Sequence, residues 1–246
     1  MIPAINHKIE KDFQLRKGEI HAFLNPYTYV VLRKHQDLIS QFDVIHFDGI
    51  ALCGIYQLFG VKSVARRSFD MTSVARDVLE EASNSRLTVA IVGTEKGTID
   101  TAVNRLVEKF SIEVVLSRDG YFDSPEELRG FQEKILEVNP DILIAGMGVI
   151  RQEKFLADLK QMGWEGTGFT CGGFLHQTAD RLEYYPQALD KLNLRWAYRV
   201  WKDPYVIRRY CLDYPKFLYC FIKDYVSWKF KQNRELKPTV QGTIKD

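Results

Sequence analysis

The residue with the clearest potential for chemistry is Asp48, in the stretch HFDGIALCG (46–54). Asp48 follows the short run DVIHF (43–47), so a carboxylate stands where a strand is expected to end and a glycine turn to begin. A carboxylate at such a position can act as a general base that removes a proton from an attacking hydroxyl group. Asp is also a preferred N-cap residue, so it could instead cap a helix that starts after Gly49. The sequence leaves both roles open.

Two glycine-rich turns are the next candidates for binding a ligand. Gly93 opens the turn GTEKG (93–97), whose backbone N–H groups could face a phosphate, although the sequence does not have the spacing of a P-loop. Gly146 and Gly148 stand at the end of another apolar run, where a ligand could approach the backbone closely. Gln152 then supplies an amide that can read a sugar hydroxyl or a base edge. The alternative is a pair of plain turns, with Gln152 and Glu153 solvated at the start of a helix.

An aromatic residue and two arginines complete the set of candidate ligand-binding residues. Tyr121, in the turn DGYF (119–122), could stack on a nucleobase or could cover the edge of the core. Arg66 and Arg67 precede a predicted helix, and arginine pairs bidentately with phosphate oxygens, so a diphosphate partner is plausible. Simple solvation of both arginines is the alternative.

Motif spacing argues against several kinds of catalytic site. The five histidines show neither HxxxH nor HExxH spacing, and the four cysteines form no CxxC pair. The chain has no DxD motif for a divalent cation on a nucleotide diphosphate and no GxSxG elbow. No strand-like segment is followed by GxGxxG, which argues against a dehydrogenase. We therefore expect neither a bound metal nor a cofactor.

The elements that must position these residues alternate between strand-like and helix-like segments. This alternation predicts an α/β fold, a Rossmann-like and mostly parallel sheet with helices on both faces. A proline after Ser124 and acids in the first turn mark one helix start, and Asn139-Pro140 marks its end. The predicted strands are 21–24, 43–47, 87–93, 112–116, 141–148 and 166–173, and the predicted helical regions are 27–42, 72–82, 98–110, 125–138 and 152–162.

Parallel topology would bring the candidate residues together. In open α/β sheets, ligands bind beyond the carboxyl ends of the strands. The residues that follow the predicted strands, and so should surround one crevice, are Asn25, Asp48, Gly93, Tyr121, Gly146, Gly148 and Gly172.

The C-terminal region differs in composition from the rest of the chain. The net charge is only +2 over 246 residues, but the segment 191–231 holds ten basic and three acidic residues together with twelve aromatics. We predict an α/β domain over 1–185 and a helical segment over 186–246. Interleaved aromatic and basic residues suit a membrane interface or RNA, and they could equally form the core of a helical subdomain.

The termini and the apolar runs indicate where the protein acts. The N-terminal stretch MIPAINHKIEKDF lacks the apolar core of a signal peptide, and no apolar run approaches the roughly 20 residues needed to cross a bilayer. The spacing of the cysteines fits a reducing, cytoplasmic setting.

Taken in order, the candidate residues resemble the WecG/TagA/CpsF family of bacterial glycosyltransferases from about residue 25 to residue 209. The resemblance covers Asn25-Pro26, Asp48-Gly49, the arginine-led stretch 66–70, Gly120-Tyr121-Phe122 and the signature-like run 146–153. It continues with a Trp-x-x-Arg run at 196–199 and a Pro-x-x-x-x-Arg-Arg run at 204–209. Two departures are Ile150, where the signature has proline, and His176, where many members have aspartate.

The resemblance implies inverting transfer of a sugar from a UDP-sugar donor to a polyprenyl-diphosphate-linked saccharide, in the synthesis of cell-surface polysaccharide. The donor sugar would be a hexose, a HexNAc or a hexuronic acid. The resemblance also implies a protein at the cytoplasmic face of the cell membrane, associated peripherally, acting without metal or nucleic acid, and compatible with a homo-oligomer. The implied roles are catalysis by Asp48; nucleotide-sugar binding by Asn25, Gly93, Tyr121, Gly146, Gly148 and Gln152; and phosphate or acceptor binding by Arg66, Arg67, Arg199, Arg208 and Arg209.

A second hypothesis comes from a different class of protein. The basic aromatic C-terminal segment would also fit a nucleotide- or RNA-binding regulatory module. Asp48→Asn discriminates between the two, because a binding module should tolerate the change and a transferase should lose turnover.

Overall fold

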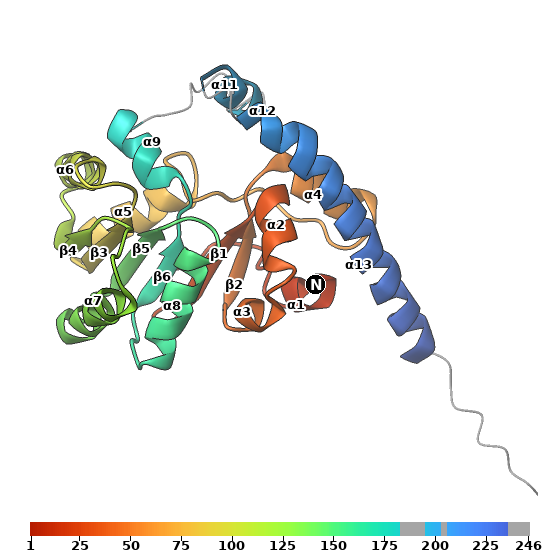
Figure 1. Ribbon diagram of the computed structural model, residues 1–246, viewed down its shortest axis with the longest axis horizontal. Helices are drawn as coiled ribbons and strands as arrows, with labels where there is room; N and C mark the ends of the chain where they lie inside the picture. Colours follow the sequence, from red (N-terminus) through yellow and green to blue (C-terminus); the bar gives the residue numbers. More distant parts are fainter. Residues whose placement is uncertain (183–194, 203–205, 236–246) are drawn as a thin grey trace, which may run out of the picture.

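The computed structural model describes residues 1–182, 195–202 and 206–235 and contains one six-stranded sheet (Figure 1). All neighbouring strands are parallel, in the order β2-β1-β6-β5-β3-β4. This confirms the predicted α/β class. The strands are β1 (Ile20–Leu24), β2 (Val44–Phe47), β3 (Thr88–Gly93), β4 (Glu113–Arg118), β5 (Ile142–Gly146) and β6 (Thr167–Thr170).

Helices cover both faces of the sheet, and each face has its own apolar core. On one face lie α2 (Pro26–Leu32), α3 (Gln36–Ser40), α4 (Ile50–Leu58), α7 (Pro125–Val138) and α8 (Arg151–Gln161). On the other lie α5 (Val74–Asn84), α6 (Thr98–Phe110) and α9 (Phe174–Asp180). The remaining described helices are α1 (Ile2–Asn6), α11 (Arg195–Lys202), α12 (Val206–Arg208), the π-helical turn η1 (Arg209–Asp213) and α13 (Tyr214–Glu235).

The central strands are apolar on both sides because both faces are covered. In β3, Ala90 and Val92 belong to one core, while Val89 and Ile91 belong to the other. Alternate side chains of a strand point to opposite faces, so a strand between two helical layers must be apolar throughout. This is why β3 and β5 were recognisable as continuous apolar runs.

The start and stop signals in the sequence are confirmed at α7. The Ser124 hydroxyl accepts a hydrogen bond from the Glu127 N–H at 3.2 Å, and Pro125 occupies the first helical position. Asn139 then ends the helix in the left-handed conformation, with φ 49°, immediately before Pro140. The predicted helical region 27–42 is instead two short helices, α2 and α3.

Helix α13 runs along the outside of the molecule beside α2 (Figure 1). Its Phe217 and Phe221 are buried in the core shared with α2 and α4, and Phe217 meets the ring of Tyr29 edge to face at 5.2 Å. The predicted boundary near residue 185 lies outside the described residues. No helix among the described residues is long and apolar enough to cross a membrane.

Candidate active site

The carboxyl ends of the six strands form one edge of the sheet. At two places along this edge, neighbouring strands are followed by helices on opposite faces of the sheet. The connection from β3 passes through α6 on one face, whereas the connection from its neighbour β5 passes through α8 on the other. The neighbouring strands β1 and β6 are likewise followed by α2 and α9 on opposite faces. Such divergence is where ligands bind in open α/β sheets. With strands about 4.8 Å apart, this edge spans about 24 Å from β4 to β2.

Asp48 stands at the β2 end of this edge, one residue before the N-cap position of the following helix. Its backbone N–H donates to the Leu24 carbonyl at 2.7 Å, which extends the pairing of β2 with β1 by one residue. Helix α4 has Gly49 as its N-cap residue, with φ 122°. The Asp48 side chain is half-buried. The N-cap position that the sequence offered to Asp48 is therefore occupied by Gly49.

The adjacent residues Arg66 and Arg67 have different surroundings in the structure. Residue 66 forms a β-bridge with Phe47, and the Arg67 N–H donates to the Phe47 carbonyl at 2.9 Å, so this segment runs alongside the end of β2. The Arg67 guanidinium donates to the carbonyls of Glu10 and Lys11 and thereby holds the N-terminal segment. Side chains of adjacent extended residues point to opposite sides. Arg66 is therefore the arginine on the Asp48 side.

The pKa of the Cys53 thiol is shifted by two charged side chains near it. Burial raises the pKa of Cys53 to about 11, the positive charge of Arg66 lowers it, and the carboxylate of Asp48 raises it. Both charged groups therefore lie within electrostatic reach of the first turns of α4. A carboxylate and a guanidinium are thus gathered at the β2 end of the crevice.

Asn25 stands next to this pair, at the end of β1, and its oxygen caps α2. Asn25 Oδ1 accepts from the Thr28 N–H at 3.0 Å, while the Thr28 hydroxyl accepts from the Asn25 N–H at 2.7 Å. This reciprocal capping box fixes the start of α2. The amide nitrogen of Asn25 is not part of the cap.

Gly93 and Gly146 are accounted for by packing between strand ends. Both are buried, and a Cβ on Gly93 would overlap the carbonyl of Gly146. A Cβ on Gly146 would lie 2.7 Å from the sulfur of Cys171. Gly120 closes over them, because its N–H donates to the Thr94 carbonyl at 3.0 Å. These glycines let the loops after β3, β4 and β5 approach each other closely.

Gly148, by contrast, is exposed and lies in the left-handed region with φ 84°. Ile150 follows with φ 77°, a conformation that a β-branched residue rarely adopts. A proline ring holds φ near −65°, so the turn before α8 differs from one built on the proline of the family signature.

Gln152 and Glu153 are buried, so their interpretation as solvated first-turn residues is wrong. Glu153 accepts from the Ile150 N–H at 2.6 Å and from Gln152 Nε2 at 2.8 Å, and burial raises its pKa. Gln152 Oε1 accepts from the Gly172 N–H at 3.3 Å. The Gln152 amide is thus held at its nitrogen by Glu153, and its oxygen ties the start of α8 to the loop after β6.

Tyr121 does not cover the core, because its side chain is 55% exposed. The guanidinium carbon of Arg151, the first residue of α8, lies 5.7 Å from the centre of the Tyr121 ring. The loop after β4 folds over the end of β3 and so brings Tyr121 to the start of α8. Arg151 was not predicted as a site residue; its position three residues after Gly148, at a helix start, was the available signal.

The three C-terminal arginines are only partly described. Arg199 lies in α11 and Arg209 begins η1, but their side chains are outside the described part of the structure. Arg208 ends α12 with an exposed side chain. Across the described residues there is no group of three or more His, Cys, Asp or Glu side chains placed to hold a metal ion.

The sheet, its two switch points and the residues along its carboxyl edge define an α/β protein of the Rossmann-like, ligand-binding class. Residues 2–231 match the model of the glycosyl transferase WecG/TagA/CpsF family, and the chain belongs to that family. It is therefore a glycosyltransferase, which favours the transferase hypothesis over a regulatory RNA-binding module.

Two relatives show the range of this family. The chain is 32% identical over 223 residues to the UDP-Gal:alpha-D-GlcNAc-diphosphoundecaprenol beta-1,4-galactosyltransferase of Shigella boydii, covering 90% of this chain and 92% of that protein. It is 23% identical over 222 residues to the N-acetylglucosaminyldiphosphoundecaprenol N-acetyl-beta-D-mannosaminyltransferase of Bacillus subtilis (strain 168), covering 88% and 84% respectively.

Proposed function

We propose that the protein transfers a hexose from a UDP-sugar to a saccharide carried on a polyprenyl diphosphate, with inversion at the anomeric carbon, in the synthesis of cell-surface polysaccharide. The names of both relatives give a diphosphoundecaprenol-linked acceptor, and one gives a UDP-Gal donor. UDP-galactose is the first donor to test because the relative that uses it shares more sequence with this chain. UDP-HexNAc and UDP-hexuronic acid are the other donor classes.

The observation that carries this proposal is the placement of Asp48. It lies at the ligand-binding edge, is half-buried, and comes one residue before the N-cap residue of α4. In the proposed reaction, Asp48 takes the proton of the acceptor hydroxyl while that oxygen forms a bond to the anomeric carbon. The bond from the anomeric carbon to the diphosphate breaks, and UDP leaves with the electron pair. A single displacement of this kind inverts the configuration and needs only one general base.

The order of the strands supports a direction for the donor along the crevice. Tyr121 projects from the β4 side, the exposed Gly148 turn follows β5, and Asn25 and Asp48 follow β1 and β2. The uracil would stack on Tyr121, the diphosphate would lie over the start of α8, and the sugar would reach toward Asp48. Arg66 would supply positive charge at the acceptor end.

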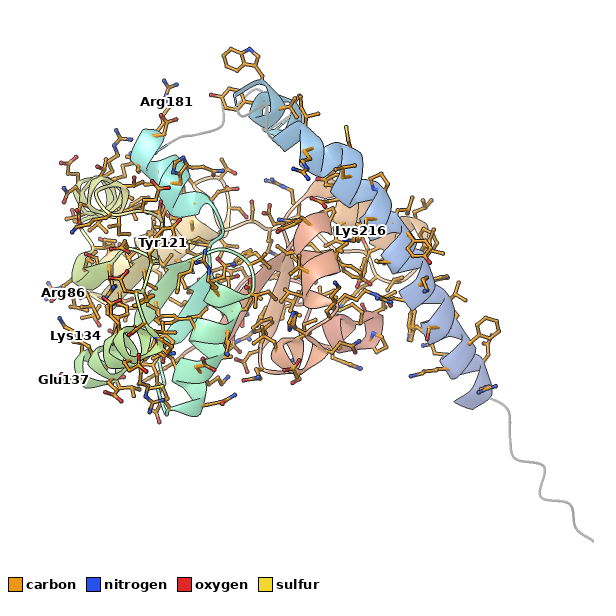
Figure 2. All side chains as sticks on the ribbon, viewed as in Figure 1. Arg86, Tyr121, Lys134, Glu137, Arg181 and Lys216 are labelled. Atoms are coloured by element: carbon orange, nitrogen blue, oxygen red, sulfur yellow. The ribbon has the colours of Figure 1, made fainter. Side chains whose placement is uncertain are left out.

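Helix α13 supports peripheral contact with an anionic lipid surface at the acceptor end of the molecule. Its outer face carries a row of exposed apolar side chains, which we call the outer stripe: Leu218, Tyr219, Ile222, Val226 and Phe230. Lysines border the outer stripe, and Lys223 and Lys229 contact neighbouring aromatic rings. An apolar face bordered by cations suits an interface with anionic headgroups. In the view of Figure 2, Tyr121 lies left of centre and Lys216 of α13 lies right of centre, so the proposed nucleobase and lipid contacts come from different elements of the fold.

The test is a panel of UDP-sugars offered with a short polyprenyl-diphosphate GlcNAc acceptor, with and without a chelator. We expect turnover with a UDP-hexose, an inverted linkage in the product, and no loss of turnover on chelation.

Asp48→Asn should retain UDP binding and lose about 10²- to 10⁴-fold in kcat. Asp43→Asn, a carboxylate at the other end of β2, is the matched control and should keep kcat. Wild-type-like turnover by Asp48→Asn would overturn the assignment of the base, and turnover that stops on chelation would overturn the metal-free mechanism.

A further inference from the structure

Arg151 and Tyr121 form a contact between two loops that the sequence separates by 30 residues. Arg151 is exposed at the first position of α8, and its guanidinium carbon lies 5.7 Å from the Tyr121 ring centre. Tyr121 is held by its own loop, because its N–H donates to Asp119 Oδ1 at 3.0 Å and its carbonyl accepts from Arg118 at 3.1 Å. The ring therefore has a fixed base, one face toward Arg151, and more than half of its surface in solvent.

The charge of Arg151 is not neutralised by the acidic residues around it. The nearest acid on its own helix, Glu153, is buried and accepts from Ile150 and Gln152. Asp119, in the facing loop, accepts from the Tyr121 N–H. Within the described residues, Arg151 takes part in no ion pair. A guanidinium with its donors facing solvent beside a ligand-binding edge is suited to an anion with paired oxygens.

The surroundings of Arg151 fit a diphosphate better than a free carboxylate or a single phosphate. The guanidinium approaches Gly148, since a Cβ placed on Gly148 would lie 3.7 Å from Arg151 Nη2. Gly148 is exposed backbone at the β3/β5 switch point, where α8 begins, and a helix start adds N–H groups that favour negative charge. An exposed aromatic ring on one side and an exposed turn on the other match a nucleoside joined to phosphates.

We propose that Arg151 binds the diphosphate of the nucleotide-sugar donor, and that Tyr121 holds the guanidinium in place with one ring face while it offers the other to the base. This inference rests on the proposed UDP-sugar donor and names a group that contacts it. In the reaction, Arg151 would stabilise the negative charge that grows on UDP as the bond to the sugar breaks.

The experiment compares the binding of UDP and of uridine by calorimetry for the full chain and three variants. Arg151→Gln should weaken UDP binding about 10- to 100-fold, since a charge-assisted hydrogen bond is lost, and should leave uridine binding unchanged. Arg151→Lys should recover part of the affinity, because it keeps the charge without the planar fork. Lys154→Gln removes an exposed charge one turn further along α8 and should change neither affinity.

The outcomes separate this inference from the function on which it rests. If the wild type binds UDP and Arg151→Gln binds it equally well, Arg151 does not contact the diphosphate. A loss of UDP and uridine binding to the same extent would place Arg151 in support of the Tyr121 ring alone and would also overturn the inference. If the wild type binds neither UDP nor uridine, the proposed donor class itself fails. A salt titration adds a further check, because the difference between UDP and uridine should shrink as ionic strength rises.

Discussion

The pair His21 and His46 is a buried polar contact between β1 and β2. His21 Nδ1 and His46 Nε2 lie 3.0 Å apart on adjacent strands, and the rings are 0% and 3% exposed. One nitrogen must donate and the other accept, so the contact requires at least one neutral ring. Burial lowers the pKa of His21 to about 4, and burial together with the charges of His21 and Arg67 lowers the pKa of His46 to about 3.

This pair predicts a loss of stability in mild acid. The unfolded chain takes up protons at both rings as the pH falls below about 6.5, whereas the folded protein excludes them until about pH 4. The unfolded state therefore binds more protons in that window, and the free energy of unfolding falls by up to about 2.7 kcal/mol per pH unit. Urea unfolding at pH 7 and pH 5 measures this, with His21→Leu/His46→Leu expected to flatten the dependence. His7→Gln, an exposed histidine, is the control; equal midpoints at both pH values in the wild type would contradict the prediction.

Ile150 gives a second prediction at the residue scale. Its N–H donates to the buried Glu153 carboxylate at 2.6 Å, and its φ of 77° is closed to proline. Ile150→Pro should therefore destabilise the protein by about 3 kcal/mol or more, although proline is the residue of the family signature. Ile150→Asn keeps the N–H and tolerates the left-handed region, so it should cost less. Urea unfolding decides, and a proline variant as stable as the asparagine variant would show that the turn can be rebuilt.

The sequence could predict which residues follow a strand and so lie along the carboxyl edge of the sheet. It could not predict which groups their side chains contact. The predicted end of β2 placed Asp48 at the crevice, but the letters HFDG could not show that Gly49 takes the N-cap position of α4. The sequence gives no reason to assign different roles to Arg66 and Arg67. In the structure, Arg67 differs because its guanidinium donates to backbone carbonyls of the N-terminal segment. Gln152 was predicted to lie near the ligand from its place after Gly148, while its hydrogen bond to Gly172 depends on a loop 20 residues away.

At the scale of elements, the sequence predicted the strands well because burial on both faces makes them continuous apolar runs. The helices were less predictable where packing, rather than pattern, ends them. The region 27–42 has helical spacing throughout, yet the chain breaks it into α2 and α3. Helix α4 was not among the predicted helices, because Gly54 interrupts its pattern and Ile50 and Leu58 are exposed apolar residues.

A partly buried ion pair holds α13 against α2. Asp224 accepts from Arg33 Nε at 2.8 Å and from the Tyr29 hydroxyl at 2.9 Å, and Arg33 Nη2 lies 2.8 Å from its other oxygen. The Asp224 side chain is 11% exposed and that of Arg33 is 32% exposed. Because α2 begins at the crevice with Asn25, this contact links the position of α13 to the active site.

We predict that Asp224→Ala lowers the free energy of unfolding by about 2–3 kcal/mol and loosens α13. The loss is smaller than for a fully buried pair, because water can reach Arg33 once its partner is gone. Urea unfolding gives the stability, and limited proteolysis gives the accessibility of α13. Ser227→Ala, an exposed position on the same helix, is the control. Unchanged protease resistance in Asp224→Ala would mean that Phe217 and Phe221 alone hold the helix.

At the scale of the whole molecule, the order of the strands places the candidate donor-binding and acceptor-binding residues at different points along one edge of the sheet. Tyr121 and Arg151 lie at the β4 and β5 side, Asp48 and Arg66 lie at the β2 side, and α13 lies beyond them next to α2 (Figure 1). A donor entering from one side and a lipid-linked acceptor from the other would meet at Asp48. Composition indicated an unusual C-terminal segment, but it could not show that one face of α13 completes the core while the opposite face stays exposed.

The exposed face of α13 provides the prediction at this scale. Ile222 and Val226, one turn apart in the outer stripe, are 40% and 43% exposed, so replacing both with Asn should leave the fold intact. The double substitution should abolish co-sedimentation with vesicles that contain anionic lipid, because the apolar contact with the acyl boundary is lost.

Lys223→Gln/Lys229→Gln should weaken binding to anionic vesicles by about 2 kcal/mol and leave binding to neutral vesicles unchanged. Ser227→Asn is the matched control on the same helix. The Ile222→Asn/Val226→Asn variant should still turn over a short, water-soluble acceptor while losing activity on one embedded in a bilayer. If it sediments with vesicles like the wild type, the outer stripe is not the surface that meets the membrane.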